Sequence, residues 1–165
     1  NTARLLLQRV GSDQMQLSQE IIKLSIAYKK IIKEAVEDLV EQTPQSKIFT
    51  LLEALFRGDL NKTLEIYKDQ RLQSEEPQKI LAMIIWQLEL ITLAVFAPQK
   101  SVSELINTGM SPFSAQKSLD LSRHISKAQV TFYVSELARI DALSKSSADI
   151  ESALEVYFAE VATNR

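Results

Sequence analysis

The feature that most constrains this chain is an apolar run at residues 80–96, ILAMIIWQLELITLAVF. A helix built from this run is apolar on nearly every side, so it must be surrounded by lipid or by protein. Gln87 and Glu89 lie near its middle, and an ionised glutamate at mid-bilayer costs about 2.5–3.5 kcal/mol. The run is also marginally short for a membrane span. We therefore predict a buried central helix that begins at Pro77 and is anchored in the core by Trp86, and no membrane contact.

The composition of the whole chain favours helix. Its 165 residues include only 3 glycines and 4 prolines, and no segment shows the alternation that is typical of strands. A chain of this length can bury roughly 70% of the surface that its unfolded form exposes. The absence of cysteine excludes disulfides and thiolate metal sites. We predict an all-α protein of about nine helices with a sizeable core.

Residues 48–67, IFTLLEALFRGDLNKTLEIY, predict two helices joined by a tight corner. Apolar residues recur at three- and four-residue steps before Gly58, which gives the first helix one apolar stripe. Gly58 can take a positive φ and end that helix, and Asp59 can accept backbone N–H bonds as the N-cap of the second. The segment contains no evident catalytic side chain, so we expect it to act through packing.

Capping residues and prolines predict the other helix boundaries. Thr43 and Pro44 form the first firm break, because proline suits the first helical turn and disfavours helix in the residue before it. Residues 29–33, KKIIK, contain neither a cap nor a glycine, so the second and third helices are either separate or continuous. Later boundaries are predicted at a Ser101/Glu104 capping box, at Ser111 with Pro112 and Phe113, at a Ser126/Gln129 capping box and at residues 146–149.

The sequence contains no pattern typical of a catalytic, cofactor or metal site. Its three glycines are far apart, which excludes a glycine-rich phosphate loop, and His124 is the only histidine, which leaves no partner for a triad or a histidine metal site. Residues 1–33 hold six basic and two acidic residues, a net charge of +4. This basic end is either a solvated face or a contact for nucleic acid or an acidic partner.

Four polar residues are candidates for contact with a partner. Asp141 falls at the edge of an apolar helical stripe, where a carboxylate needs a bond either to a neighbouring helix end or to another subunit. Gln87 and Glu89 on the central helix likewise need a hydrogen-bond partner, either within the chain or on another subunit. Arg123 lies near the end of the helix that begins at Pro112. We expect the function to depend on such surfaces.

Five segments follow one another along the chain: IFTLLEAL, the corner at Gly58 and Asp59, EPQKILAMIIWQL, GMSPF and LARIDALSK. Their order resembles the delta subunit of the bacterial DNA polymerase III clamp loader. Upstream of them, LLLQRVGSDQMQLSQEIIKLSI is similar to the lid region of that family, and KEAVEDLV is similar to its last lid helix. Ile32 stands where the family usually has a serine or threonine cap. Together with these upstream segments, the resemblance covers nearly the whole chain.

The resemblance implies a short helical lid fragment followed by a helical-bundle collar. Residues 1–43 would be the end of an AAA+ lid domain, and residues 44–165 would be the collar, which assembles with the collars of delta-prime and tau/gamma subunits. The chain would then be part of a non-catalytic, cytoplasmic subunit of the polymerase III holoenzyme, without a cofactor. Contact with the sliding clamp and primed DNA would occur only through the full complex.

Three other readings fit parts of the sequence. They are a generic helical adaptor, the collar of another clamp-loader subunit such as delta-prime, and an enzyme or nucleic-acid binder that uses the basic end. No fixed-period repeat supports the adaptor. Because the chain starts at Asn1 without a methionine, we expect it to be a fragment whose clamp-opening module lies upstream.

Overall fold

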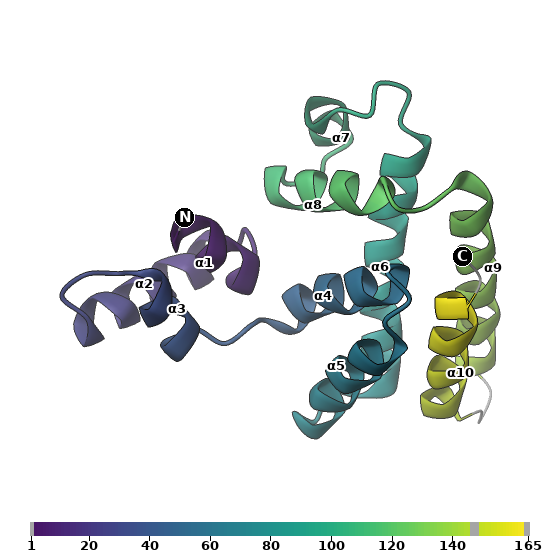
Figure 1. Ribbon diagram of the computed structural model, residues 1–165, viewed down its shortest axis with the longest axis horizontal. Helices are drawn as coiled ribbons and strands as arrows, with labels where there is room; N and C mark the ends of the chain where they lie inside the picture. The colour runs from purple at the N-terminus through teal and green to yellow at the C-terminus, as the bar shows by residue number, and fades with distance from the viewer. Residues whose placement is uncertain (1, 146–148, 164–165) are drawn as a thin grey trace. The chain divides into compact units, whose positions relative to one another are not determined.

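The computed structural model describes residues 2–145 and 149–163, and over these ranges it contains ten helices and no strand. This confirms the all-α prediction. The count exceeds nine because the turn after Ala27 separates the second and third helices. The helices, labelled in Figure 1, are α1 (Thr2–Val10), α2 (Gln14–Ala27), α3 (Lys33–Leu39), α4 (Pro44–Phe56), α5 (Leu60–Leu72), α6 (Pro77–Phe96), α7 (Val102–Asn107), α8 (Pro112–Ser122), α9 (Lys127–Ser144) and α10 (Ile150–Thr163).

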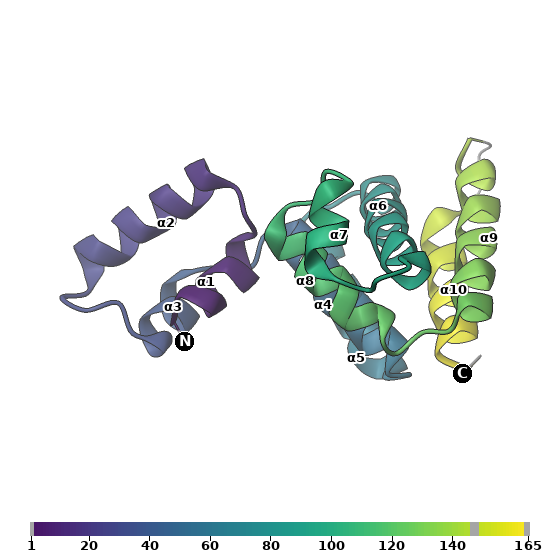
Figure 2. The ribbon, with the colours of Figure 1, turned by 90° about the horizontal axis from the view of Figure 1, so that it is seen from above.

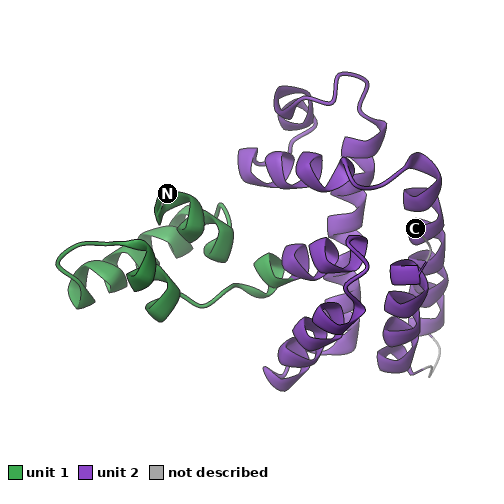
Figure 3. Ribbon diagram, viewed as in Figure 1, with its two compact units in different colours: residues 1–47 green, residues 48–165 purple. Residues whose placement is uncertain are grey.

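The chain divides into two compact units, shown in Figure 3. Unit 1 is Asn1–Lys47 and unit 2 is Ile48–Arg165. The helix α4 starts at the predicted break, Pro44, and the division between the units falls one turn later.

Unit 1 has a small apolar core of its own, to which α1, α2 and α3 all contribute. Asp13 caps α2, since its carboxylate accepts a bond of 2.9 Å from the Gln16 N–H. Ile32, at the N-cap of α3, makes no such bond. The Arg9 guanidinium donates to the Val40 carbonyl and thereby ties α1 to the end of α3. The core residues are Leu6, Val10, Leu24, Ala35, Val36 and Val40.

The corner between α4 and α5 is built as predicted. Gly58 has a φ of 73°, and its N–H donates to the Leu55 carbonyl at 2.9 Å. The Asp59 N–H donates to the Ala54 carbonyl at 3.0 Å, and the Asp59 carboxylate accepts from the Lys62 N–H at 3.0 Å. Two carbonyls in the last turn of α4 and one N–H in the first turn of α5 are thus satisfied by local bonds that span three to five residues.

The helix α6 forms the spine of unit 2, with α8 and α9 packed against it (Figures 1 and 2). Its residues Ile80, Ile84, Leu88 and Ile91 lie in the main core, together with residues of α4, α5, α9 and α10. By length and composition α6 could also cross a membrane, but the core helix of a soluble protein meets the same criteria. The buried side chains recur every three or four residues, so they occupy one side of the helix.

The prediction that Trp86 anchors the core is wrong. Trp86 is 46% exposed, and Leu93 and Phe96 are each 48% exposed. These three residues lie on the side of α6 that its neighbours within unit 2 leave uncovered. A run that is apolar on nearly every side does not indicate which side faces the core, so the sequence could not show this.

Aromatic rings link the remaining elements of the main core. Phe56 of α4 stacks on Tyr133 of α9, with ring centroids 5.6 Å apart, and Tyr67 of α5 meets Phe158 of α10 edge-on at 5.4 Å. Burial raises the pKa of Tyr67 to about 12, so its hydroxyl stays protonated at neutral pH. The helices α9 and α10 lie side by side in Figure 2.

The predicted caps in the second half of unit 2 hold with one exception. Ser126 and Gln129 form the expected reciprocal capping box, and Ser111 caps α8 ahead of Pro112. Glu104 does not reach back to Ser101, because its carboxylate accepts instead from the Gln99 N–H at 3.0 Å.

Two other structural predictions concern Phe113 and the last break. The Phe113 ring packs edge-on against Phe49, with centroids 6.1 Å apart, so this residue joins α8 to α4 as a structural contact. The last predicted break is at residues 146–149, of which residues 146–148 lie outside the described ranges. Its final residue, Asp149, accepts a hydrogen bond through its carboxylate from the Ser152 N–H at the start of α10.

Candidate protein–protein interface

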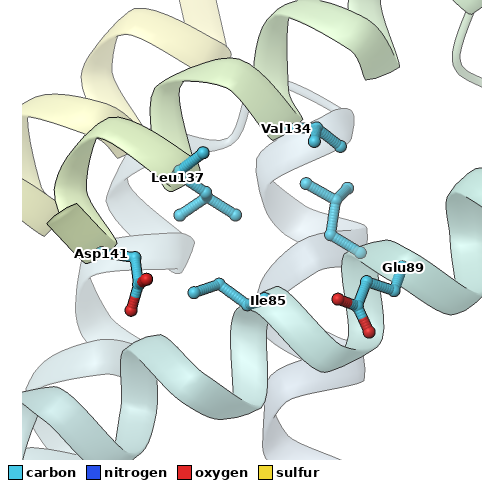
Figure 4. A pocket seen from close by; sticks show the side chains of 7 residues that line it. Ile85, Glu89, Val134, Leu137 and Asp141 are labelled. Atoms are coloured by element: carbon cyan, nitrogen blue, oxygen red, sulfur yellow. The ribbon is translucent and has the colours of Figure 1, made fainter.

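A groove of about 200 Å³ lies between α6 and α9 (Figure 4). Leu88 and Leu137 are almost fully buried and close its floor, while the remaining side chains form its walls. The two helices meet because both place apolar stripes in the main core. The groove is lined by Ile85, Leu88 and Glu89 of α6 and by Val134, Leu137, Ala138 and Asp141 of α9.

Two of the predicted partner contacts, Glu89 and Asp141, line this groove. Figure 4 shows Asp141 near Ile85 at one end and Glu89 near Val134 at the other. One oxygen of Asp141, Oδ2, lies 3.1 Å from the Lys145 ammonium nitrogen. Within the described residues, Glu89 makes no hydrogen bond or ion pair. The groove is therefore apolar inside and acidic at its ends.

Exposed apolar side chains on α6 lie beside the groove. Trp86, Leu93 and Phe96 follow one another at steps of seven and three residues, so they share one side of the helix. We call these three residues the α6 stripe. The Lys127 ammonium nitrogen lies 5.1 Å from the centroid of the Phe96 ring, which is within cation–π range. Exposed aromatic clusters of this kind are typical of protein interfaces.

Gln87 does not belong to this surface. Its side chain is 1% exposed, and neither its amide nitrogen nor its amide oxygen has a hydrogen-bond partner among the described residues. The predicted contact with a partner is therefore not available to it in this structure. Gln87 falls on the core side of α6, between Ile84 and Ile91.

Replacing Gln87 with leucine is expected to raise the free energy of unfolding by about 1 kcal/mol, because it removes an unpaired buried amide from the core. Urea unfolding followed by circular dichroism measures the change. The control is Gln78→Leu on the exposed side of the same helix, for which we expect no gain. A loss of stability in Gln87→Leu would show that the amide is satisfied in solution.

Arg123 is exposed but does not line the groove. It is the C-cap of α8, and its guanidinium lies 3.7 Å from the Asp120 carboxylate. It stays a candidate contact. The sequence alone does not indicate the α6 stripe, since an apolar run gives no signal that separates exposed from buried positions.

Comparison with known proteins identifies the family. The family model for the C-terminal domain of the DNA polymerase III delta subunit matches residues 45–161. DNA polymerase III subunit delta of Bacillus subtilis (strain 168) is 26% identical over an alignment of 145 residues, and the match covers 84% of this chain and 42% of that protein.

The solved structure of the Bacillus subtilis DNA clamp loader delta protein is similar with a TM-score of 0.89 and 25% identity. The match covers 99% of this chain and 50% of that one, so the present chain spans half or less of the length of these relatives. The resemblance that the five segments carried is thereby confirmed: the chain belongs to the DNA polymerase III delta subunit family, through its C-terminal domain.

Proposed function

We propose that this chain is a subunit-assembly module of a clamp-loader delta subunit. Unit 2 acts as the helical collar and unit 1 as the end of an AAA+ lid, with the domain boundary after Thr43. The observation that carries this proposal is the family match over residues 45–161, which coincides with nearly all of unit 2. The match favours a delta subunit over a generic helical adaptor.

The mechanism proposed for the chain is assembly, without a reaction of its own. Delta-prime and tau/gamma collars pack against unit 2, and the resulting ring fixes the order of the modules that open the sliding clamp and place it on primed DNA. The surface best suited to such packing is the α6 stripe with the adjoining groove, because it combines exposed aromatic and aliphatic side chains with an unpaired carboxylate. The complex would work in the bacterial cytoplasm as a non-catalytic part of the holoenzyme.

Mixing the chain with delta-prime and tau/gamma subunits at micromolar concentration tests the proposal. We expect co-migration with one or both partners in size-exclusion chromatography, at an elution volume earlier than that of any component alone. Separate elution of all components at tens of micromolar would contradict it. Variants of the α6 stripe, such as Trp86→Ala, are expected to weaken the complex while the fold, followed by circular dichroism, is retained.

A further inference from the structure

We infer that the groove between α6 and α9 binds an amphipathic helix of a neighbouring clamp-loader subunit, which inserts one apolar side chain into the groove and sets a lysine or arginine beside Glu89. The inference rests on the proposed function and adds to it the place and the chemistry of the contact. Four observations support it: the size of the groove, its apolar lining, the exposed Glu89 carboxylate without an ion pair among the described residues, and the direction in which the α6 stripe runs along the helix.

The size and lining of the groove fit a protein side chain. A volume of about 200 Å³ is below the roughly 300–1,000 Å³ that is typical of small-molecule sites. Its floor, Leu88 and Leu137, belongs to the main core and is fixed by it. Ile85, Val134 and Ala138 add apolar walls without a hydrogen-bonding side chain. The occupant is therefore a single aliphatic or aromatic side chain that leaves water on docking.

The acidic ends of the groove define the charge of the partner. Glu89 is exposed and has no ion pair among the described residues. Two lysines at the ends of α9 are already engaged, Lys145 with the Asp141 carboxylate and Lys127 with the Phe96 ring. Docking of an apolar surface removes water from Glu89, and a carboxylate that loses water needs a cation in its place. A basic residue on the partner, next to its apolar anchor, supplies that cation.

The geometry of the surface fits a helix. Two packed helices form the groove, and the described residues offer no sheet edge to which a strand could add, so helix-in-groove binding is the mode that the surface allows. The α6 stripe runs from Trp86 to Phe96, ten residues or about 15 Å along the helix axis. A partner helix of about three turns covers the stripe while its anchor enters the groove.

Affinity measurements on groove variants test the inference. The chain is titrated into delta-prime and, separately, into tau/gamma, and dissociation constants are determined by isothermal titration calorimetry. Glu89→Lys reverses the charge of the groove and Ala138→Trp fills it; both positions are exposed, so the fold should be retained. We expect each to weaken binding to the partner that uses the groove by about tenfold or more.

The matched control is Glu65→Lys, which makes the same charge change on the exposed side of α5. Its dissociation constant should stay within about twofold of the wild-type value.

A milder variant separates a loss of the contact from a loss of the fold. Glu89→Gln keeps the shape of the side chain, and it should lower both the affinity and the salt dependence of binding, because one charge pair is lost. If the wild-type chain binds and Glu89→Lys, Glu89→Gln and Ala138→Trp bind equally well, the groove is not the contact, although the proposed function stands. If Ala138→Trp alone binds normally, no side chain enters the groove. If the wild-type chain binds neither partner, the proposed function fails and the groove assignment fails with it.

Discussion

Replacing Ile84 with alanine should lower the free energy of unfolding of unit 2 by about 3 kcal/mol, within the range of roughly 2–5 kcal/mol found for buried isoleucine-to-alanine changes. Ile84 is 0% exposed and lies in the middle of α6, where it belongs to the main core together with residues of α4, α9 and α10. The substitution removes three carbon atoms from a packed interior and leaves a cavity. Urea unfolding, followed through the fluorescence of Trp86, the single tryptophan of the chain, measures the loss in unit 2.

The control for this variant is Leu93→Ala on the exposed side of the same helix. Leu93 is 48% exposed, so its truncation should cost less than about 1 kcal/mol. Its effect should instead be seen in assembly, since Leu93 belongs to the α6 stripe. Equal stability losses for Ile84→Ala and Leu93→Ala would mean that the two sides of α6 are equally buried in solution, contrary to the structure.

Replacing Gly58 with valine should cost about 2 kcal/mol or more. The φ of 73° lies in the left-handed region, which costs a residue with a Cβ about 1–2 kcal/mol, and a β-branched side chain fits it worst. The chain cannot relax this angle freely, because the Gly58 and Asp59 N–H groups both donate to carbonyls at the end of α4. The midpoint of urea unfolding is the direct readout.

Gly58→Asn is the matched control for the corner. Asparagine tolerates the left-handed region better than other residues with a side chain, so its loss should be clearly smaller than that of valine. An unchanged midpoint for Gly58→Val would show that the corner is not built with a positive φ. Equal losses for valine and asparagine would assign the effect to the added side chain and not to the backbone angle.

Local rules predicted the ends of the helices well. Asp59, Ser111 and Ser126 cap helices as expected, because the bond that each makes lies within three residues of its own position. Pro77 is the first residue of α6, where its fixed φ suits the first turn and its missing N–H would have had no partner within the helix. Glu104 is the exception, and its carboxylate had an alternative donor, the Gln99 N–H, that a pattern of two residues cannot anticipate.

Tertiary packing determines which side of α6 faces the core, and the sequence alone does not indicate that side. The run at residues 80–96 predicted a central helix correctly, but Trp86, which was expected in the core, is exposed, and Gln87, a candidate contact for a partner, is buried. In a run that is apolar on nearly every side, the side that faces the core depends on which neighbouring helices pack against it. For the same reason Glu89 and Asp141, each noticed as a carboxylate in an apolar stripe, could not be placed in one groove before α6 and α9 were seen together.

The environment of Trp86 in the assembled complex tests the central claim most directly. Because the chain has one tryptophan, labelling it with 5-fluorotryptophan gives a single ¹⁹F resonance that reports on the α6 stripe alone. On addition of unlabelled delta-prime and tau/gamma, we predict that this resonance shifts and loses its sensitivity to D₂O, since a partner covers the half-exposed ring. A resonance that keeps its position and its solvent sensitivity at saturating partner concentrations would contradict the assignment of this surface to subunit assembly.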